Sequence, residues 1–410
     1  MNRGPAFAEV ERSVIALCHS GLSSDKLRSQ VLTQLGRLLP ADAVWWAAAD
    51  PATLLFTSAH RVGLPADSAS YFIDNEFLTD DVNRWTALAR DRVGVRSLAR
   101  ATNGRFEDSA RYRDIFAPLG LGDELRAVLR IQGETWGLLC LHQAAGRSYT
   151  AQEATWLRRL APHLAAGMRL AVLHESADDV HNAAAPGIVM LSADGSIVSA
   201  TSRGQEWLDE LTTGSSGTDS VPIAVQAVAA QLRSIDADGE VQPRLRLRTR
   251  AGRWVVLHAS WIAVSGDPVI AVIIEAAAPT EVAPVIMLAY GLTAQERKVT
   301  GLISRGLSTA EVADEIYIST DTVQDHLKSV FAKTGTGSRG ELVATLMRQQ
   351  YLPRAKAGIK RTGKDISGDC LFDRGLDGPA ALAGILHKTG KFLQLRVLCQ
   401  RRRAEIEQPG

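Results

Sequence analysis

The polar side chains between positions 320 and 329 are the ones best suited to bind another molecule. Thr320, Gln324 and Lys328 recur at intervals of four, so a helix would carry a hydroxyl, an amide and an ammonium group along one face. They are flanked by Asp321, Asp325 and Ser329. Such groups can hydrogen-bond to the edges of base pairs in a DNA major groove. A solvated helix face has the same pattern, so the neighbouring elements must decide between the two interpretations.

The opposite face of this segment is apolar. Four apolar residues at i, i+4, i+7 and i+8 commit it to a hydrophobic core. They are Val323, Leu327, Val330 and Phe331. Ser319 or Thr320 can cap the start of the helix. The sequence therefore predicts a helix with one buried face and one polar face.

Two shorter helices precede it and would hold it in place. The first begins at a Thr293 cap with Glu296 three residues on, and stops at Gly306. The second begins at Ser308 with Glu311 three residues on. Their expected core residues are Leu292, Val299, Leu302 and Ile303 in the first, and Val312, Ala313 and Ile316 in the second. Two capped helices and a tight turn give a groove-reading helix rigid support.

The joint pattern over 291–347 is far more specific than any one residue. It consists of GLT-x-x-E, G-L-S-x-x-E-V-A, I-x-I-S-x-x-T-V-x-x-H-L and S-R-x-E-L-V in this order. This pattern resembles the LuxR-type helix-turn-helix family. The resemblance implies an all-α four-helix DNA-binding domain over 285–352, whose fourth helix, at 341–348, serves as a dimerisation face.

The resemblance also implies roles for individual positions. Gln324, Asp325 and Lys328 fall where members of the family contact bases. Phosphate-contacting or capping positions of the family hold Ser308, Thr309, Thr320, Thr322, Lys333 and Arg339. Contacts of the second kind orient a protein on DNA and carry little sequence information. Glu296 falls where the family has an acid that could pair with Arg339, and a purely structural salt bridge is the alternative to a DNA role for both.

One departure from the family lies after Lys333. Here the order is Gly335, Thr336, Gly337, where the family usually has a glycine followed by an apolar residue. We expect this change to loosen the entry to the fourth helix.

Charge gives little help to a nucleic-acid interpretation. The net charge of the whole chain is +1, and seven basic residues between 291 and 352 are matched by seven acidic ones. The segment 353–410 has twelve basic residues against six acidic ones, and we expect it to be a basic, largely irregular extension. Because phosphate binding depends on local cations, this extension or dimerisation would supply the missing electrostatic affinity.

The first third of the chain alternates between helical and strand periods. The expected elements are a helix to Leu39, strands 44–49 and 54–59, helices 80–90 and 107–116, strands 124–131 and 135–142 joined by a hairpin turn, and a closing helix 150–173. A Thr150 and Glu153 capping box should begin the closing helix. This order, with the stretch DELRAVLRIQGETWGLLCLH, resembles a GAF domain, which implies an α+β sensor module over 1–175.

A second unit follows at 184–276. GIVMLSADGSIVSATSRGQEWLDEL indicates strand, Asp-Gly turn, strand and helix, and RLRLRTR, WVVLHASWIAV and VIAVIIEA indicate three further strands. The element order resembles a PAS-type domain, which implies a five-stranded antiparallel sheet with helices on one face. Residues 277–284, AAPTEVAP, are expected to be a proline-containing connector. The fold class is therefore multidomain, with two α+β sensor modules followed by the all-α domain.

Several other candidate sites have structural explanations that we favour. His142 and His163 show no second ligand at metal spacing, and Cys140 lies in an apolar strand, so no metal, cofactor or redox role is expected. Four tryptophans could line a ligand pocket or equally belong to the core: Trp45, Trp46, Trp85 and Trp136. A row of alternating arginines, Arg244, Arg246, Arg248 and Arg250, is typical of a strand with a solvated outer face.

Location and redox state follow from two absences in the sequence. The chain has four cysteines far apart, Cys18, Cys140, Cys370 and Cys399, which favours a reducing compartment. The first residues lack the basic-then-apolar run of a secretory signal, and no apolar stretch reaches the ~18 residues of a membrane span. We expect a cytoplasmic protein without membrane contact.

The function expected from all this is sequence-specific transcription regulation and not catalysis. The expected partners are double-stranded DNA with an inverted-repeat operator, a second copy of the chain, a small-molecule effector and RNA polymerase. Two other classes remain open: a small-molecule enzyme built on the GAF-like module, and a protein-interaction adaptor that does not bind DNA. Neither a phosphate-binding loop nor a Ser-His-Asp signature favours the enzyme.

Overall fold

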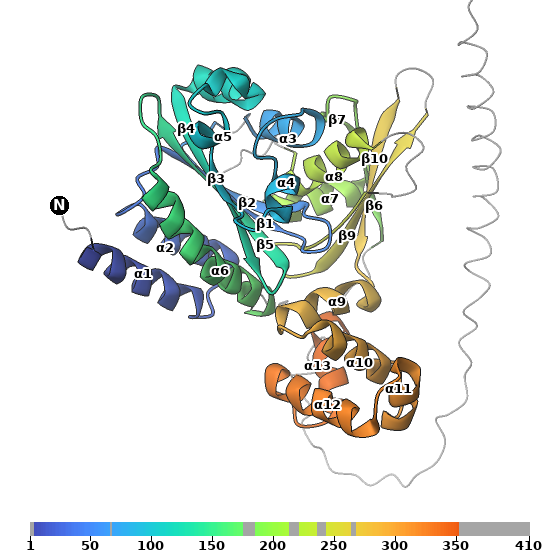
Figure 1. Cartoon of the computed structure of the whole chain (residues 1–410). Helices are drawn as coiled ribbons and strands as arrows, with labels where there is room; N and C mark the ends of the chain where they lie inside the picture. Colours follow the sequence, from blue (N-terminus) through green and yellow to red (C-terminus); the bar gives the residue numbers. More distant parts are fainter. Residues whose placement is uncertain are drawn as a thin grey trace, which may run out of the picture. The chain divides into compact units, whose positions relative to one another are not determined.

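The computed structural model describes residues 4–65, 68–174, 185–212, 221–235, 243–263 and 268–351. The predicted basic extension at 353–410 lies outside these described residues. The described chain forms two five-stranded sheets with their helices, followed by a group of helices (Figure 1).

The first sheet has helices on both faces. Its strands are β1 (Ala43–Ala49), β2 (Phe56–Val62), β3 (Val95–Ser97), β4 (Leu121–Ile131) and β5 (Glu134–Ala144). They pair antiparallel in the order β2-β1-β5-β4-β3. One face carries α1 (Gly4–Cys18), α2 (Ser24–Leu35) and α6 (Ala151–His174), and the other carries α3 (Ser68–Leu78) and α4 (Trp85–Arg90). Coverage on both faces explains why β4 and β5 are buried along most of their length.

Local sequence signals correctly predicted the turn between β4 and β5 and the start of α6. The two-residue turn between β4 and β5 places both Gln132 and Gly133 in the left-handed region, with φ of 54° and 87°. Such a turn matches the twist of the hairpin, and it confirms the expected connection. The capping box of α6 is also present, because the Glu153 N–H donates to the Thr150 hydroxyl (3.2 Å) and the Glu153 carboxylate accepts from the Thr150 N–H (2.8 Å).

Other elements of this unit were not predicted. Helices α1 and α3 and the short strand β3 are additions, and α5 (Leu98–Ala101) follows β3 directly. The predicted helix over 107–116 was wrong in kind, since that stretch consists of a 3-10 turn at Phe106–Asp108 and a π-helical turn at Tyr112–Phe116. Hydrogen bonds from Ser109 and Arg111 to the buried carboxylate of Asp81 hold this irregular backbone in place.

The second sheet repeats the strand order of the first. It contains β6 (Gly187–Leu191), β7 (Ile197–Ala200), β8 (Arg244–Arg248), β9 (Trp254–Ile262) and β10 (Val269–Ala276), paired antiparallel as β7-β6-β10-β9-β8. Helix α7 (Ser202–Leu211) was predicted, and α8 (Ile223–Ser234) was not. Both pack on the apolar face of the sheet. The five strands are confirmed, while the assignment to the PAS class stays a prediction.

The arginine row of β8 does not form a fully solvated face. The Arg246 guanidinium donates to the Asp50 carboxylate at 2.9 and 3.1 Å, and the Asp50 side chain is fully buried. The Arg248 guanidinium lies over the Trp254 ring, 5.6 Å from its centroid. Alternation marks the two faces of a strand but cannot tell which part of them another segment covers, so the prediction of a solvated face was wrong for Arg246 and Arg248 and holds for the exposed Arg244 and Arg250.

The expected connector at 277–284 is helical. Helix α9 (Pro279–Ala289) begins with Pro279 in its first turn, where the missing N–H is no loss and the fixed φ suits a helix. Pro284 lies inside the helix and removes one further N–H. The buried side chains of α9 offset this cost: Val282, Val285, Ile286, Met287 and Ala289.

The remaining helices are α10 (Ala294–Ser304), α11 (Thr309–Ile316), α12 (Thr320–Thr334) and α13 (Arg339–Tyr351). They form the four-helix domain predicted from the sequence (Figure 1). In the part of the chain that the structure describes, no helix combines the length and the apolar character needed to span a bilayer.

Candidate nucleic-acid interface

Two capping boxes fix the helices that precede the polar face. The Thr293 N–H donates to the Glu296 carboxylate at 2.7 Å, and the Ser308 N–H donates to the Glu311 carboxylate at the same distance. Each hydroxyl accepts the N–H of the glutamate in return, at 3.3 Å. Both predicted boxes are therefore confirmed, and Ser308 acts as a cap.

The turn between α11 and α12 is tight. Tyr317 ends α11 in the left-handed conformation, with φ of 58°, and its side chain is 93% exposed. Ser319 caps α12, because its hydroxyl accepts the Thr322 N–H at 3.1 Å. Thr320 is the first residue of the helix itself, which resolves the choice between the two capping candidates.

The apolar face of α12 lies in the core as predicted. Val323, Leu327 and Val330 are buried, and Phe331 is partly buried. Val323 and Leu327 share a cluster with apolar residues of α10 and α11. This packing fixes the rotation of α12 about its axis, so it also fixes which side chains point outward.

The predicted base-contacting residues Gln324, Asp325 and Lys328 are all exposed on the outward side of α12. Thr320 and Thr322, predicted as phosphate-contacting or capping residues, are exposed as well. The Lys328 ammonium is 3.0 Å from the Asp325 carboxylate, one helical turn away, and both side chains are about three-quarters exposed. An exposed ion pair of this kind contributes little to stability. Lys328 and Asp325 can therefore separate and bind other partners at little cost in free energy.

The buried acid of this domain has a different partner from the one expected. The Glu296 carboxylate accepts from the Lys333 ammonium at 2.6 and 2.8 Å and from the Ser329 hydroxyl at 2.6 Å. The expected pairing with Arg339 was wrong. Burial alone would raise the pKa of Glu296, but these hydrogen bonds, the Thr293 N–H and the Lys333 charge lower it from 4.5 to about 2. Lys333 therefore ties α12 to the start of α10.

Arg339 contacts the other preceding helix. Its guanidinium donates to the Thr309 hydroxyl, which connects the start of α13 to the first turn of α11. Four of the predicted phosphate-contacting or capping residues thus hold structural positions: Ser308, Thr309, Lys333 and Arg339. A contact of any of them with DNA stays a prediction.

The entry to α13 is not loosened by the unusual Gly335–Gly337 sequence. Gly335 ends α12 in the left-handed region, with φ of 68°. Thr336 is buried, and its hydroxyl bonds to that of Thr334 at 2.9 Å, so it fills the place of the usual apolar residue. The Ser338 hydroxyl then accepts the Glu341 N–H at 3.2 Å and begins α13.

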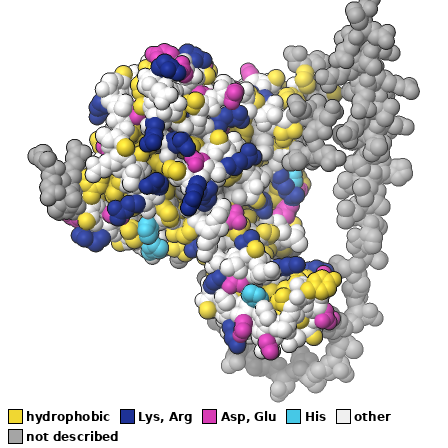
Figure 2. All heavy atoms as spheres, in the orientation of Figure 1, with side chains coloured by type: hydrophobic (Ala, Val, Ile, Leu, Met, Phe, Trp, Pro, Cys, Tyr) yellow, Lys and Arg dark blue, Asp and Glu magenta, His cyan; other side chains and the backbone are white. Residues whose placement is uncertain are grey.

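Acidic and basic side chains are mixed on the visible surface of α9–α13 (Figure 2). This distribution agrees with the balance of seven basic and seven acidic residues between 291 and 352. Because non-specific DNA affinity follows the local excess of cations, the domain offers only modest electrostatic attraction to a duplex.

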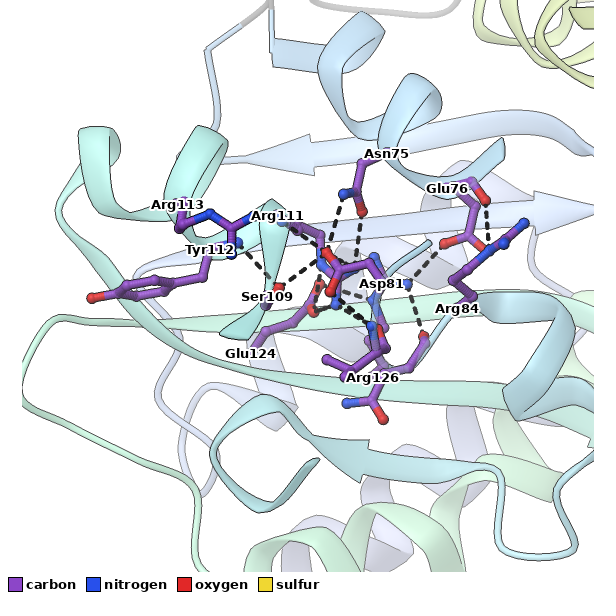
Figure 3. A network of polar contacts seen from close by, with 12 residues as sticks. Asn75, Glu76, Asp81, Arg84, Ser109, Arg111, Tyr112, Arg113, Glu124 and Arg126 are labelled. Carbon is purple, nitrogen blue, oxygen red and sulfur yellow. Dashed lines mark hydrogen bonds and ion pairs between the residues drawn. The ribbon is translucent and has the colours of Figure 1, made fainter. Parts of the chain in front are cut away.

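The sensor module contains a polar site that the sequence did not reveal. Asp81, Arg111, Glu124 and Arg126 point toward one another between the first sheet and α3 (Figure 3). Arg111 and Arg126 each donate to Glu124, at 2.9 and 3.0 Å, and Arg126 also reaches Glu76 at 2.9 Å. The charges of Arg111 and Arg126 outweigh burial and lower the pKa of Glu124 to about 2. The four tryptophans that could have lined a pocket are buried, Trp45 and Trp85 on one face of the sheet and Trp46 and Trp136 on the other, and Trp136 borders a cavity of about 370 Å³.

Comparisons with known proteins agree with these two folds. Residues 291–346 match the family of bacterial regulatory proteins of the LuxR type, and residues 23–168 match the GAF domain. The chain is 37% identical over 61 residues to the spore germination protein GerE of Bacillus subtilis, covering 15% of this chain and 82% of that protein. The chain belongs to the LuxR family of bacterial regulatory proteins.

Two longer regulators are also similar to this chain. One is the monoamine regulon transcriptional regulator of Klebsiella aerogenes, 43% identical over 65 residues, or 16% of this chain and 27% of that protein. The other is a helix-turn-helix transcriptional regulator of Mycobacterium bovis, 45% identical over 58 residues, or 14% of this chain and 7% of that protein. This chain therefore spans only a small share of their length.

Proposed function

We propose that the protein is a sequence-specific DNA-binding transcription regulator of the cytoplasm, in which α12 reads base edges in the major groove. The observation that carries the proposal is the orientation of α12. Its apolar face is locked against α10 and α11, and Lys333 is tied to Glu296, so its exposed polar face has one fixed direction. A helix held in this way can present side chains to a groove without further ordering.

Each residue of the exposed face has a chemical role in this proposal. The Gln324 amide donates and accepts at once, which suits adenine. Lys328 donates to guanine acceptors or to a phosphate, and Asp325 accepts from cytosine. Thr320 and Thr322, at the first turn of α12, lie where hydroxyls can reach a phosphate beside a helix N-terminus.

The regulator acts as a homodimer on an inverted repeat in this proposal. Two-fold symmetric helix-turn-helix dimers place their half-sites about 34–36 Å apart, one turn of DNA. The fourth helix is the dimerisation face that family resemblance implies. Leu342 and Leu346 are buried within the chain, so the residues left for a partner are the exposed and half-exposed ones such as Val343 and Ala344. The GAF domain would receive a small-molecule signal.

Selection of bound sequences from random duplex DNA by the full chain tests the proposal. We expect an enriched inverted repeat, with Gln324→Ala relaxing the preference at one position of each half-site. Gln295→Ala is the matched control, because Gln295 is an exposed amide on α10. No enrichment, with footprinting also blank, would leave the adaptor; turnover of a small molecule by the GAF domain would favour the enzyme.

Lys328→Ala separates a phosphate contact from a base contact. If Lys328 binds a phosphate, the variant weakens binding to all duplexes alike and lowers the salt slope by about one unit. If it binds a base, the loss falls on one position and costs about 1–3 kcal/mol. Lys298→Ala, at an exposed lysine of α10, should do neither.

A further inference from the structure

Three side chains that bind metal ions well meet on the first sheet, on the face that α3 covers. Cys140 and His142 are two residues apart on β5 and so lie on one face of the sheet. In the register of β4 and β5, Glu124 pairs directly with His142. One carboxylate oxygen, the thiol sulfur and one imidazole nitrogen all lie within 4.8 Å of one another. All three side chains are buried.

Both ring nitrogens of the buried His142 imidazole are available to bind a ligand. Its ring packs against Phe116 and Phe72, with centroids 4.9 and 6.1 Å apart, and the residue is fully buried. Within the described part of the chain, neither ring nitrogen has a hydrogen-bond partner. Buried polar atoms without a partner are unfavourable, so these two nitrogens call for an explanation such as a bound ion or water.

Glu124 retains room for another partner. Its Oε2 accepts from the Nε and Nη2 atoms of Arg111, at 3.1 and 2.9 Å, while its Oε1 accepts from the Nε of Arg126 at 3.0 Å. An ionised carboxylate has about four acceptor positions, and the Cys140 thiol hydrogen-bonds to this carboxylate beside the arginines, so a metal ion can take the place of the thiol proton. The two arginines also fix the carboxylate in place, as groups around a metal site commonly do.

The buried charges of the network are not balanced. Three carboxylates, those of Glu76, Asp81 and Glu124, face two guanidinium groups, and all five side chains are at most 4% exposed. A divalent ion that displaces the Cys140 thiol proton to solvent adds one net positive charge beside these carboxylates. Metal binding by a thiol releases a proton in this way.

We propose that Glu124, Cys140 and His142 bind a borderline-soft divalent metal ion, such as zinc, inside the GAF domain. Zinc accepts thiolate, imidazole and carboxylate ligands together. Magnesium and calcium prefer sets made of oxygen, which this cluster does not offer. Three protein ligands leave a fourth tetrahedral position, so a small donor molecule can complete the site.

Metal content and a cobalt spectrum of the full chain test the proposal. The protein is produced with Cys370→Ser and Cys399→Ser, which removes the thiols of the extension, in cells grown with zinc or with cobalt. We expect about one ion per chain after purification and, with cobalt, a near-ultraviolet thiolate-to-cobalt band beside the visible bands of a tetrahedral site. Cys140→Ser should abolish the thiolate band, and Cys18→Ser, at another buried cysteine, should leave it unchanged.

Two further variants keep the test decisive if Cys140→Ser does not fold. His142→Gln and Glu124→Gln should each lower the metal content while circular dichroism shows a native fold. A purified chain with no bound metal, or a thiolate band that survives in Cys140→Ser, would overturn the assignment. Because no DNA enters these measurements, their outcome is independent of the regulator's DNA binding.

Discussion

Glu296 shows how one buried carboxylate can set the geometry of a distant surface. It is 5% exposed, it takes part in the capping box of α10, and it binds Lys333 and Ser329 of α12. The Glu296 carboxylate therefore accepts a free N–H at the start of α10 and also holds the C-terminal half of α12 in place. This site stabilises the ionised carboxylate far more than the neutral acid, because each partner of Glu296 donates a hydrogen bond to it.

The lowered pKa of Glu296 predicts a pH dependence of stability. A carboxyl whose pKa is about 2 in the folded chain and about 4.5 when unfolded stabilises the fold above pH 4.5 and loses this effect as the pH falls toward 2. Glu296→Gln cannot titrate. The difference in melting temperature between wild type and variant should therefore be largest near pH 6 and shrink steadily below pH 4.5. Glu315→Gln, at an exposed position of α11, is the control; a gap that stays constant with pH would contradict the assignment.

Tyr317 predicts a stabilising substitution. A tyrosine in the left-handed region is strained, and its exposed ring contributes no packing in the free protein. Tyr317→Gly should therefore raise the stability by about 0.5–1 kcal/mol. Tyr317→Val, the matched control, should lower it because a β-branched residue tolerates this conformation badly.

Thermal denaturation of both Tyr317 variants checks this prediction. If glycine destabilises the protein as much as valine does, the conformation of Tyr317 is not the reason for the change. A Tyr317→Gly variant that is more stable but binds DNA less tightly would instead reveal a contact of the ring with the duplex.

At the level of elements, local sequence signals predicted the LuxR-type four-helix domain almost completely. Capping residues such as Thr293, Ser308 and Ser319 act within one helical turn, and the apolar spacing of α12 reports its buried face directly. The fold of this domain and the exposure of Gln324 and Lys328 could therefore be predicted without the structure. The partner of Glu296 could not be predicted in this way, because only the packing of the helices decides whether Lys333 or Arg339 reaches its carboxylate.

The sensor module shows the limit of such signals. Cys140 and His142 lie two apart on one strand, which was visible in the sequence, but Glu124 joins them only through the register of a hairpin. The three side chains are therefore not close enough in sequence to form a recognisable metal-binding motif. They come together only because β4 and β5 pair. Register depends on the turn at Gln132–Gly133, and one residue of slip would have placed Glu124 on the opposite face.

The packing of α9 predicts that one substitution in its core will lower the stability of the C-terminal helices. Ile286 is fully buried in a cluster with Val330, Leu342 and Leu346. Ile286→Ala should lower the free energy of unfolding of the C-terminal helices by about 2–5 kcal/mol. Urea unfolding followed by circular dichroism measures this change, with Thr280→Ala at an exposed position of α9 as control. Equal midpoints for the two variants would show that α9 is no part of this core.

At the scale of the whole molecule, the proposed DNA binding predicts that much of the electrostatic affinity comes from outside the four-helix domain. The segment 353–410 has an excess of six positive charges, whereas the domain has none. Removing residues after Leu352 should therefore make the logarithm of the binding constant fall less steeply with the logarithm of salt concentration. Fluorescence anisotropy at several salt concentrations measures both slopes, and identical slopes would exclude a role for the segment.

The two faces of α9 have unequal anchors. Val282, Ile286 and Met287 share a cluster with buried residues of α12 and α13 and with partly buried residues at the end of α6, while Val285 and Ala289 belong to the main core cluster of the first sheet. Burying three large apolar side chains is worth about 5–9 kcal/mol, whereas an effector at a hundred times its dissociation constant supplies about 2.7 kcal/mol. If an effector binds the GAF domain, we therefore expect it to be too weak to separate α9 from α12 and α13. We expect α9 to move together with α12 and α13, with the change in backbone angles at Ala278, an extended residue between the last strand and Pro279.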